Sequence, residues 1–152
     1  MSAPSITTCL WYDSQAEEAA TLYCSLFPDA SITNRLPQIG DPQGRAFLVE
    51  FTLMGQGYTA MNGGPHYTLS PAASMMVMVD SQAEVDRLWT ALLDGGQESR
   101  CGWLTDRFGL SWQIIPRALP RLMQADPSGR VVRAMMGMIK LDIATLEAAA
   151  RG

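Results

Sequence analysis

The sequence is poor in the side chains that bind metals and form disulfides. It contains one histidine, His66, and three cysteines, Cys9, Cys24 and Cys101, none of which forms a C-x-x-C pair. A structural zinc site needs closely spaced Cys and His ligands, and a disulfide framework needs an even set of cysteines. The sequence therefore predicts no metal site and no disulfide framework, and free thiols are typical of a reducing compartment.

Positive charge is also scarce. The 152 residues contain 11 Lys and Arg against 15 Asp and Glu, which gives a net charge of −4. Nucleic acid and anionic lipid are bound by clustered cations, so neither is expected as a partner. No apolar run approaches the roughly 20 residues of a membrane span, and residues 1–5 lack the basic and apolar regions of a secretory leader. We therefore expect a soluble, cytoplasmic protein that does not bind membranes.

An internal repeat is the most informative feature that the sequence does contain. Residues 13–17 (DSQAE) recur as residues 80–84, each time after an apolar run and before a stretch whose apolar residues have helical spacing. Two similar segments in matching surroundings indicate a duplicated unit. In each block the serine, Ser14 or Ser81, and the glutamate three positions later fit a capping box. The repeat therefore predicts that each half has a helix directly after a strand.

Strand patterns follow both predicted helices. Alternating or apolar runs predict strands at 31–36, 45–54 and 58–62 in the first half, and at 99–105 and 110–115 in the second half. The sequence therefore predicts an α+β fold of paired βαβββ modules, at 5–64 and 72–116. A helical tail at 117–152 follows, and the whole chain, 1–152, is expected to form a single domain. The tail helices are expected at 119–125, 131–139 and 143–150, the last one capped by Asp142.

Polar and aromatic side chains gather near the ends of predicted strands. Asn62 ends one strand, Ser74 begins another, and Trp103, Trp112 and Gln113 lie on the last hairpin. Aromatic walls with a few amides and hydroxyls are typical of sites for small apolar or amphipathic ligands. The alternative is that the tryptophans belong to the core and the amides cap strand ends, and the sequence leaves this choice open.

Three further residues bear on chemistry. Glu50 lies in mid-strand on the face opposite Phe47 and Phe51, where it faces either a cavity or water. Cys101 is expected within a strand as a buried, inert thiol, because nothing near it in the sequence would lower its pKa. His66 follows two glycines and a proline, which predicts a surface loop. The sequence identifies no catalytic residue.

Several motifs together resemble one protein family, the PhnB-like branch of the vicinal oxygen chelate (glyoxalase/bleomycin-resistance/dioxygenase) superfamily. Members of this branch often carry the label 3-demethylubiquinone-9 3-methyltransferase. The motifs that carry the resemblance are Cys9-Leu10-Trp11-Tyr12 before Ala16-Glu17-Glu18-Ala19, Ser25-Leu26-Phe27-Pro28, Met61-Asn62-Gly63-Gly64-Pro65, Cys101-Gly102-Trp103-Leu104, Asp106-x-Phe108-Gly109-x-Ser111-Trp112-Gln113, and a tail motif between Ala134 and Ala144. The resemblance implies curved sheets that form a cleft, usually in a homodimer.

The resemblance also implies a set of ligand positions. Metal-using members of the superfamily bind a divalent ion with His, Gln or Glu from the first and last strands of each module. The corresponding stretches of this chain supply Thr8, Asn62, Ser74 and Gln113. Neutral hydroxyls and amides leave the charge of a divalent cation uncompensated. We therefore expect a ligand cleft lined by these four residues and Trp103, with no metal and no cofactor.

The resulting hypothesis is a homodimeric protein that binds a small aromatic or quinone-like molecule in this cleft. Two alternatives stay open. The first alternative is an enzyme of the family, either the methyltransferase named in the family label or a metal-dependent isomerase, lyase or dioxygenase. The last alternative is a purely structural, dimer-forming protein, because a fold alone does not decide function.

Overall fold

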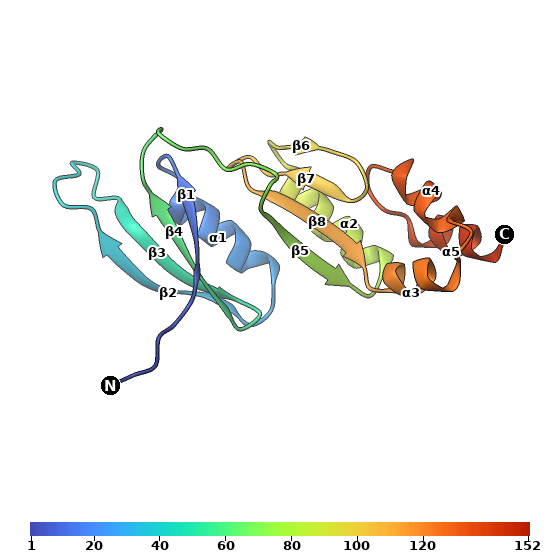
Figure 1. Ribbon diagram of the computed structural model, residues 1–152. Coiled ribbons are helices and arrows are strands. Elements are labelled where there is room, and N and C mark those ends of the chain that lie inside the picture. Colours follow the sequence, from blue (N-terminus) through green and yellow to red (C-terminus); the bar gives the residue numbers. More distant parts are fainter. The chain divides into compact units, whose positions relative to one another are not determined.

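The computed structural model describes residues 1–152. The chain forms two compact units, Met1–Leu69 and Ser70–Gly152, and each unit contains one four-stranded sheet with helices (Figure 1). The duplication that the repeated block indicates therefore has a structural counterpart in each unit.

The first unit has the order strand, helix and three strands. Its elements are β1 (Thr8–Tyr12), α1 (Ala16–Leu26), β2 (Ala30–Pro37), β3 (Ala46–Leu53) and β4 (Gln56–Asn62). The sheet order is β1-β4-β3-β2, in which β1 and β4 are parallel and the other pairs are antiparallel. All three strands predicted after the first helix are present.

One face of this sheet is covered by α1 (Figure 1). Along β3 the side chains alternate between faces, and Val49, Phe51 and Leu53 are buried while Glu50 and Thr52 are only half-buried. The helix contributes the other side of this core with Ala16, Ala19, Ala20, Tyr23 and Leu26. Burial of these apolar side chains is the main force that holds helix and sheet together.

The second unit repeats this arrangement. Its module consists of β5 (Ser74–Val79), α2 (Gln82–Leu93), β6 (Gln97–Glu98), β7 (Trp103–Thr105) and β8 (Ser111–Pro116). The sheet order is β5-β8-β7-β6, with β5 and β8 parallel, as β1 and β4 are in the first unit. The predicted α+β fold of paired βαβββ modules is therefore confirmed.

The two repeated blocks start their helices in different ways. Ser81 is the N-cap of α2, and its Oγ accepts a hydrogen bond from the Glu84 backbone N at 3.2 Å, as predicted. The same prediction for Ser14 is wrong. The N-cap of α1 is Gln15, no side chain of the block caps the helix, and the Ala16 backbone N donates instead to Asn62 Oδ1 at 2.8 Å. Asn62, at the end of β4, therefore binds a free N–H group at the start of α1, the role expected of Ser14.

The strand predicted at 99–105 is shorter in the structure. Only Trp103–Thr105 forms β7, because Cys101 (φ 61°) and Gly102 (φ 85°) lie in the left-handed region. Their backbone N–H groups donate to Met138 O and Ile139 O at 2.9 and 2.8 Å. The tail thus holds this segment in a turn, and the prediction that places Cys101 within a strand is wrong.

The tail contains three helices, as predicted. These are α3 (Ala118–Ala125), α4 (Arg130–Met136) and α5 (Ile143–Arg151), and Asp142 caps α5 by accepting from the Thr145 backbone N at 3.0 Å. Leu119, Val131, Leu141 and Leu146 form a core cluster with Ile115 of β8. These four apolar side chains of the tail are therefore buried within the second unit, whereas Met136 and Ile139 stay exposed. None of the five helices combines the length and the apolar character needed to cross a bilayer.

Candidate functional site

The predicted site residues of the first unit lie apart from each other. In the parallel ladder of β1 and β4, Thr8 pairs with Tyr58 at one end and Asn62 pairs with Tyr12 at the other. Thr8 is exposed, whereas Asn62 is 8% exposed. The structure therefore does not bring Thr8 and Asn62 together.

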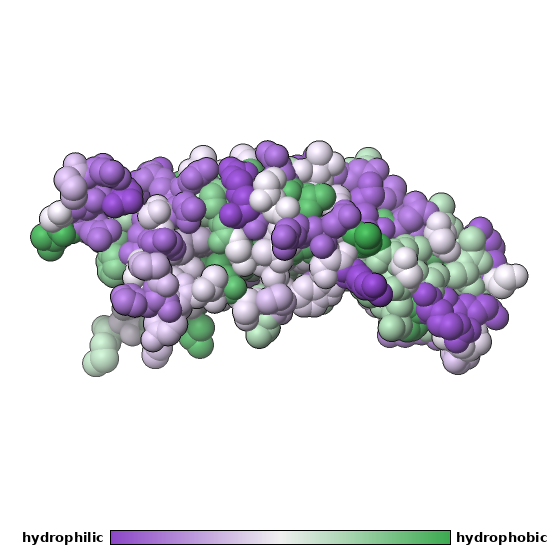
Figure 2. Space-filling view, turned by 90° about the horizontal axis from the view of Figure 1, so that it is seen from above, coloured by the Kyte–Doolittle hydropathy of each residue, from purple (hydrophilic) through white to green (hydrophobic).

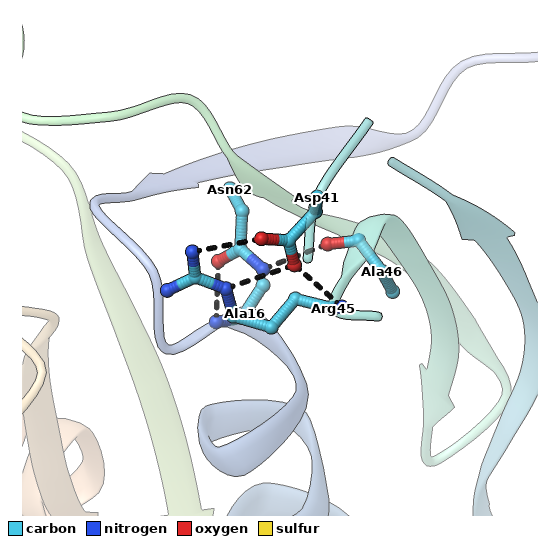
Figure 3. A network of polar contacts seen from close by, with 5 residues as sticks. All are labelled: Ala16, Asp41, Arg45, Ala46 and Asn62. Carbon is cyan, nitrogen blue, oxygen red and sulfur yellow. Dashed lines mark hydrogen bonds and ion pairs between the residues drawn. The ribbon is translucent and has the colours of Figure 1, made fainter. Parts of the chain in front are cut away.

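Asn62 is fully used in holding the first unit together. Its Oδ1 accepts from the Ala16 backbone N at 2.8 Å, and its Nδ2 donates to Ala46 O at 2.8 Å (Figure 3). The amide thus connects the start of α1, the start of β3 and the end of β4. A buried polar group needs such partners, and the alternative interpretation of this amide, a cap at a strand end, describes its contacts.

The predicted site residues of the second unit do come together. Gln113 of β8 pairs in register with Trp103 of β7 on one side and with Met76 of β5 on the other. Its Nε2 donates to Ser74 Oγ at 2.9 Å. Neighbours in register project from the same face of a sheet, so Ser74, Met76, Trp103 and Gln113 share one face. We call these four residues the Gln113 surface.

The Gln113 surface lies on the face opposite α2. Leu104, Trp112 and Ile114 alternate with its residues along β7 and β8 and are at most 1% exposed, as the core beneath α2. On the Gln113 surface, by contrast, Met76 is 60% exposed, and Ser74, Trp103 and Gln113 are half-buried. The two tryptophans of the last hairpin therefore differ: Trp112 belongs to the core, whereas Trp103 is partly open to solvent.

Ser111 adds an unusual polar atom to this face. It pairs in register with Ser74 and with Thr105, and its hydroxyl is buried without a hydrogen-bond partner. An unsatisfied buried hydroxyl is rare in folded proteins and costs about 1–3 kcal/mol. A polar group of a ligand or a water molecule would relieve this cost.

Asp106 explains why the last hairpin carries its motif. Its carboxylate is 3% exposed and accepts from the Phe108 and Leu110 backbone N and from Trp112 Nε1, at 2.9, 3.0 and 2.9 Å. These bonds close the turn and fix the core indole at the start of β8. The motif thus has a structural role, and it sets the position of Gln113 one residue later.

A pocket of about 340 Å³ lies within the first unit, and the sequence analysis missed it. It is lined by Asp13, Ser14, Gln38, Arg45, Phe47, Asn62, Gly63 and Gly64. The loop between β2 and β3, which supplies Gln38 and Arg45, carries mostly hydrophilic side chains at the left of Figure 2. Composition identifies this segment as a loop but cannot show that Gln38 and Arg45 line one pocket with Asn62 at the end of β4.

An ion pair fixes the guanidinium of Arg45 at this pocket. Arg45 Nε and Nη2 each donate to Asp41 at 3.1 Å, and the Arg45 backbone N donates to the same carboxylate at 2.7 Å (Figure 3). These hydrogen bonds lower the pKa of Asp41 to about 2 and raise the pKa of Arg45. Both groups therefore stay charged at neutral pH.

The potential nucleophiles and bases named in the sequence analysis do not gather at one site. His66 is exposed, as predicted for a loop histidine. Partial desolvation raises the pKa of the Cys24 thiol and also of the Cys9 thiol, although Cys9 as a whole residue is exposed, and this lowers their thiolate fraction at neutral pH. Cys101 lies half-buried in its turn, and Glu50 lies half-buried on the face of the first sheet that α1 does not cover.

The residues at the superfamily's ligand positions do not fit a divalent cation. Asn62 spends both polar atoms on backbone groups, and Ser74 and Gln113 are bonded to each other. All are neutral donors that would not offset a divalent charge. No group of three or more His, Cys, Asp or Glu side chains could hold a metal ion. The two strand-to-helix turns contain no glycine, so they do not fit a methyl donor that needs a glycine-rich cradle either.

Comparison with known proteins identifies the family. The family model described as 3-demethylubiquinone-9 3-methyltransferase matches residues 4–115. The chain belongs to this family. The PhnB-like resemblance of its motifs is thereby confirmed, although the match ends before the tail motif between Ala134 and Ala144. None of the curated proteins matches the chain.

Solved structures of similar proteins exist for this PhnB-like family member. A PhnB protein from Bacillus cereus is 28% identical, with a TM-score of 0.68 over 74% of this chain and 99% of that chain. Protein PA1353 from Pseudomonas aeruginosa is 22% identical, with a TM-score of 0.63 over 75% of this chain and 98% of that chain. A glyoxalase/bleomycin resistance protein from Albidiferax ferrireducens T118 is 14% identical, with a TM-score of 0.49 over 73% and 96% of the two chains.

Proposed function

We propose that this PhnB-like protein binds a small aromatic or quinone-like molecule, without a tightly bound metal, at the Gln113 surface. The observation that carries the proposal is the pair formed by Ser74 and Gln113 beside the half-buried ring of Trp103. An apolar wall with a few fixed polar groups is the usual composition of a small-molecule site. Met76 extends this wall with an exposed thioether side chain, and such side chains adapt to ligand shape.

The hydrogen bond between the two polar side chains determines what they offer a ligand. Gln113 Nε2 donates to Ser74 Oγ, so the Ser74 hydroxyl hydrogen stays available to a ligand carbonyl. Gln113 Oε1 remains an acceptor for a ligand hydroxyl. A compound with a carbonyl or hydroxyl on an aromatic or quinonoid ring uses both the polar pair and the Trp103 ring. The other two expected cleft residues, Thr8 and Asn62, belong to the first unit, so the Gln113 surface is proposed without them.

Duroquinone is a suitable probe because methyl groups occupy all its ring carbons that a thiol such as the exposed Cys9 would attack. We expect it to raise the melting temperature of the protein and to bind measurably by calorimetry. Gln113→Leu should weaken binding by about three- to tenfold, which corresponds to one hydrogen bond. The control variant Gln124→Leu, on the exposed side of α3, should bind as the parent does. If neither duroquinone nor any member of a broader panel of aromatic ketones raised the melting temperature or bound by calorimetry, the proposal would be overturned.

The family description names a methyl transfer, so the same calorimeter should also test S-adenosylmethionine. Heat from a stoichiometric complex with this donor would favour the enzyme over the binding protein. Elemental analysis of the purified chain distinguishes the remaining alternative, because a stoichiometric divalent metal would favour an isomerase, lyase or dioxygenase.

A homodimer and a cytoplasmic location complete the proposal, and both rest on the family resemblance and on the free cysteines. Light scattering during size-exclusion chromatography should give twice the chain mass of 16.6 kDa. A mass equal to one chain across micromolar concentrations would contradict the dimer but would leave the ligand site standing.

A further inference from the structure

The pocket of the first unit is a second place where a small molecule fits, and nothing in the family description assigns it. Its volume of about 340 Å³ falls within the usual range of about 300–1,000 Å³ for small-molecule sites. All of its lining residues belong to the first unit, whereas the Gln113 surface belongs to the second. A ligand site in this pocket is therefore independent of the proposed function.

The pocket presents one fixed hydrogen-bond donor of positive charge. Asp41 binds Nε and Nη2 of Arg45 and leaves Nη1 without an acceptor in the protein. Because the carboxylate holds the guanidinium at two points and also binds the Arg45 backbone N, little conformational freedom is left for a ligand to remove. A guanidinium edge of this kind suits a carboxylate group.

The pocket also presents negative charge. The Asp13 carboxylate is exposed at the pocket and has neither a hydrogen bond nor an ion pair with another residue. It is close enough to Arg45 to stabilise that charge electrostatically. Arg45, Asp41 and Asp13 together carry a net charge of −1, so an anion alone would be repelled, and an anionic group can bind at Nη1 only with a cationic group beside Asp13. A ligand that carries both a cationic and an anionic group matches this arrangement.

An aromatic wall and a tight backbone complete the pocket. Phe47 is 40% exposed there although it lies on the same strand as the buried core residues. The exposed Phe47 ring thus offers an apolar contact for a ligand side chain next to the charged groups of Arg45 and Asp13. Gly63 is packed against the Trp11 ring, where an added Cβ would lie 2.4 Å from ring carbons, and Trp11 Nε1 donates to Gly64 O at 2.9 Å. The backbone that bounds the pocket is therefore held in place.

We propose that this pocket binds a free α-amino acid with an apolar side chain: its carboxylate is bound by Arg45, its ammonium group by Asp13, and its side chain by Phe47. The Ser14 hydroxyl and the Gln38 amide, which line the same pocket, supply further hydrogen bonds. Neither group has a partner within the protein that the ligand would have to displace.

Three matched probes test the charge requirement by calorimetry on the full chain. L-phenylalanine carries both groups, 3-phenylpropanoate lacks the ammonium group, and phenethylamine lacks the carboxylate. We expect L-phenylalanine to bind at least about tenfold more tightly than either analogue. Equal binding of the three probes, or no binding of L-phenylalanine at millimolar concentration, would overturn the proposal.

Variants assign the binding to the pocket. Asp13→Asn removes a carboxylate that has no partner, so the fold should be kept, and it should weaken L-phenylalanine binding by about tenfold. Arg45→Gln should do the same. Arg87→Gln, which breaks an exposed ion pair with Glu84 on α2, is the control and should bind as the parent does. Undiminished binding in Asp13→Asn refutes this site whatever happens at Arg45. Since Gln113→Leu should leave L-phenylalanine binding intact, failure here and failure of the proposed function are told apart.

Discussion

Replacement of Asn62 by leucine tests how the first unit is held together. Leucine has nearly the same size but no polar atom, so Asn62→Leu leaves the Ala16 N–H and the Ala46 carbonyl without their partners. Each unsatisfied buried group costs about 1–3 kcal/mol. Because Asn62 borders the pocket, water can reach part of the site, and we expect a loss of about 2–4 kcal/mol in the free energy of unfolding.

Urea unfolding followed by amide resonances of β1 and β4 measures this loss in the first unit directly. Asn62→Asp is the informative companion, because a carboxylate still accepts from the Ala16 N–H but cannot donate to Ala46 O. It also places a negative charge against the Ala46 carbonyl oxygen at a site that is only 8% exposed, so Asn62→Asp should lose stability too and should regain part of it at low pH, where the protonated carboxyl can donate to Ala46 O. Asn34→Leu, at an exposed position of β2, is the control and should stay within about 0.5 kcal/mol of the parent. If Asn62→Leu were as stable as that control, the structural role assigned to this amide would be wrong.

Three further predictions concern other contacts. The Asp41 carboxyl should titrate near pH 2 in the folded protein, so the stabilisation it adds is complete above its unfolded pKa of about 3.9 and is lost as the pH falls toward 2. Carbon NMR measures this pKa, and Arg45→Gln should raise it only part of the way to the usual range, because the backbone N–H groups of residues 45 and 43 still bind the carboxylate; an unchanged value would speak against the ion pair. Gly63→Ala should destabilise the first unit by about 1–3 kcal/mol because the new methyl group collides with Trp11, while Gly57→Ala, with only ordinary contact at 3.6 Å, should show no such collision effect in the same urea experiment. Gln82→Leu removes hydrogen bonds to Leu141 O and from the Ile143 N–H and should speed amide exchange at the start of α5; exchange as slow as in Gln124→Leu would show that Gln82 does not hold the tail.

Local sequence patterns predicted most of the fold. The repeated block placed both helices correctly, and the alternation in β3 identified the buried face. The differences arise where the decisive contact is distant in sequence. Ser14 and Ser81 stand in the same local pattern, but Asn62 takes the place of the first serine at the helix start. Likewise, Cys101 and Gly102 form a turn because the tail binds their backbone.

The candidate site was predictable only where it depends on local strand patterns. Ser74 and Gln113 lie on one face of two adjacent parallel strands, two residues apart in register, and the module pattern predicts that these two strands pair. The pocket at Arg45 was missed because its lining combines the loop between β2 and β3 with residues after β1 and at the end of β4, which are distant in sequence. A signal was present: Asp41 and Arg45 are oppositely charged and four residues apart around a proline and a glycine, a spacing that favours an ion pair across a turn.

The central claim is that a small carbonyl compound is recognised on the face of the second sheet opposite α2. Chemical-shift mapping of the labelled chain during a duroquinone titration tests it most directly. The account predicts the largest shifts at Ser74, Trp103 and Gln113, with the core indole of Trp112 little affected. Shifts confined to residues outside this face, or a spectrum that does not change at saturating probe, would contradict it.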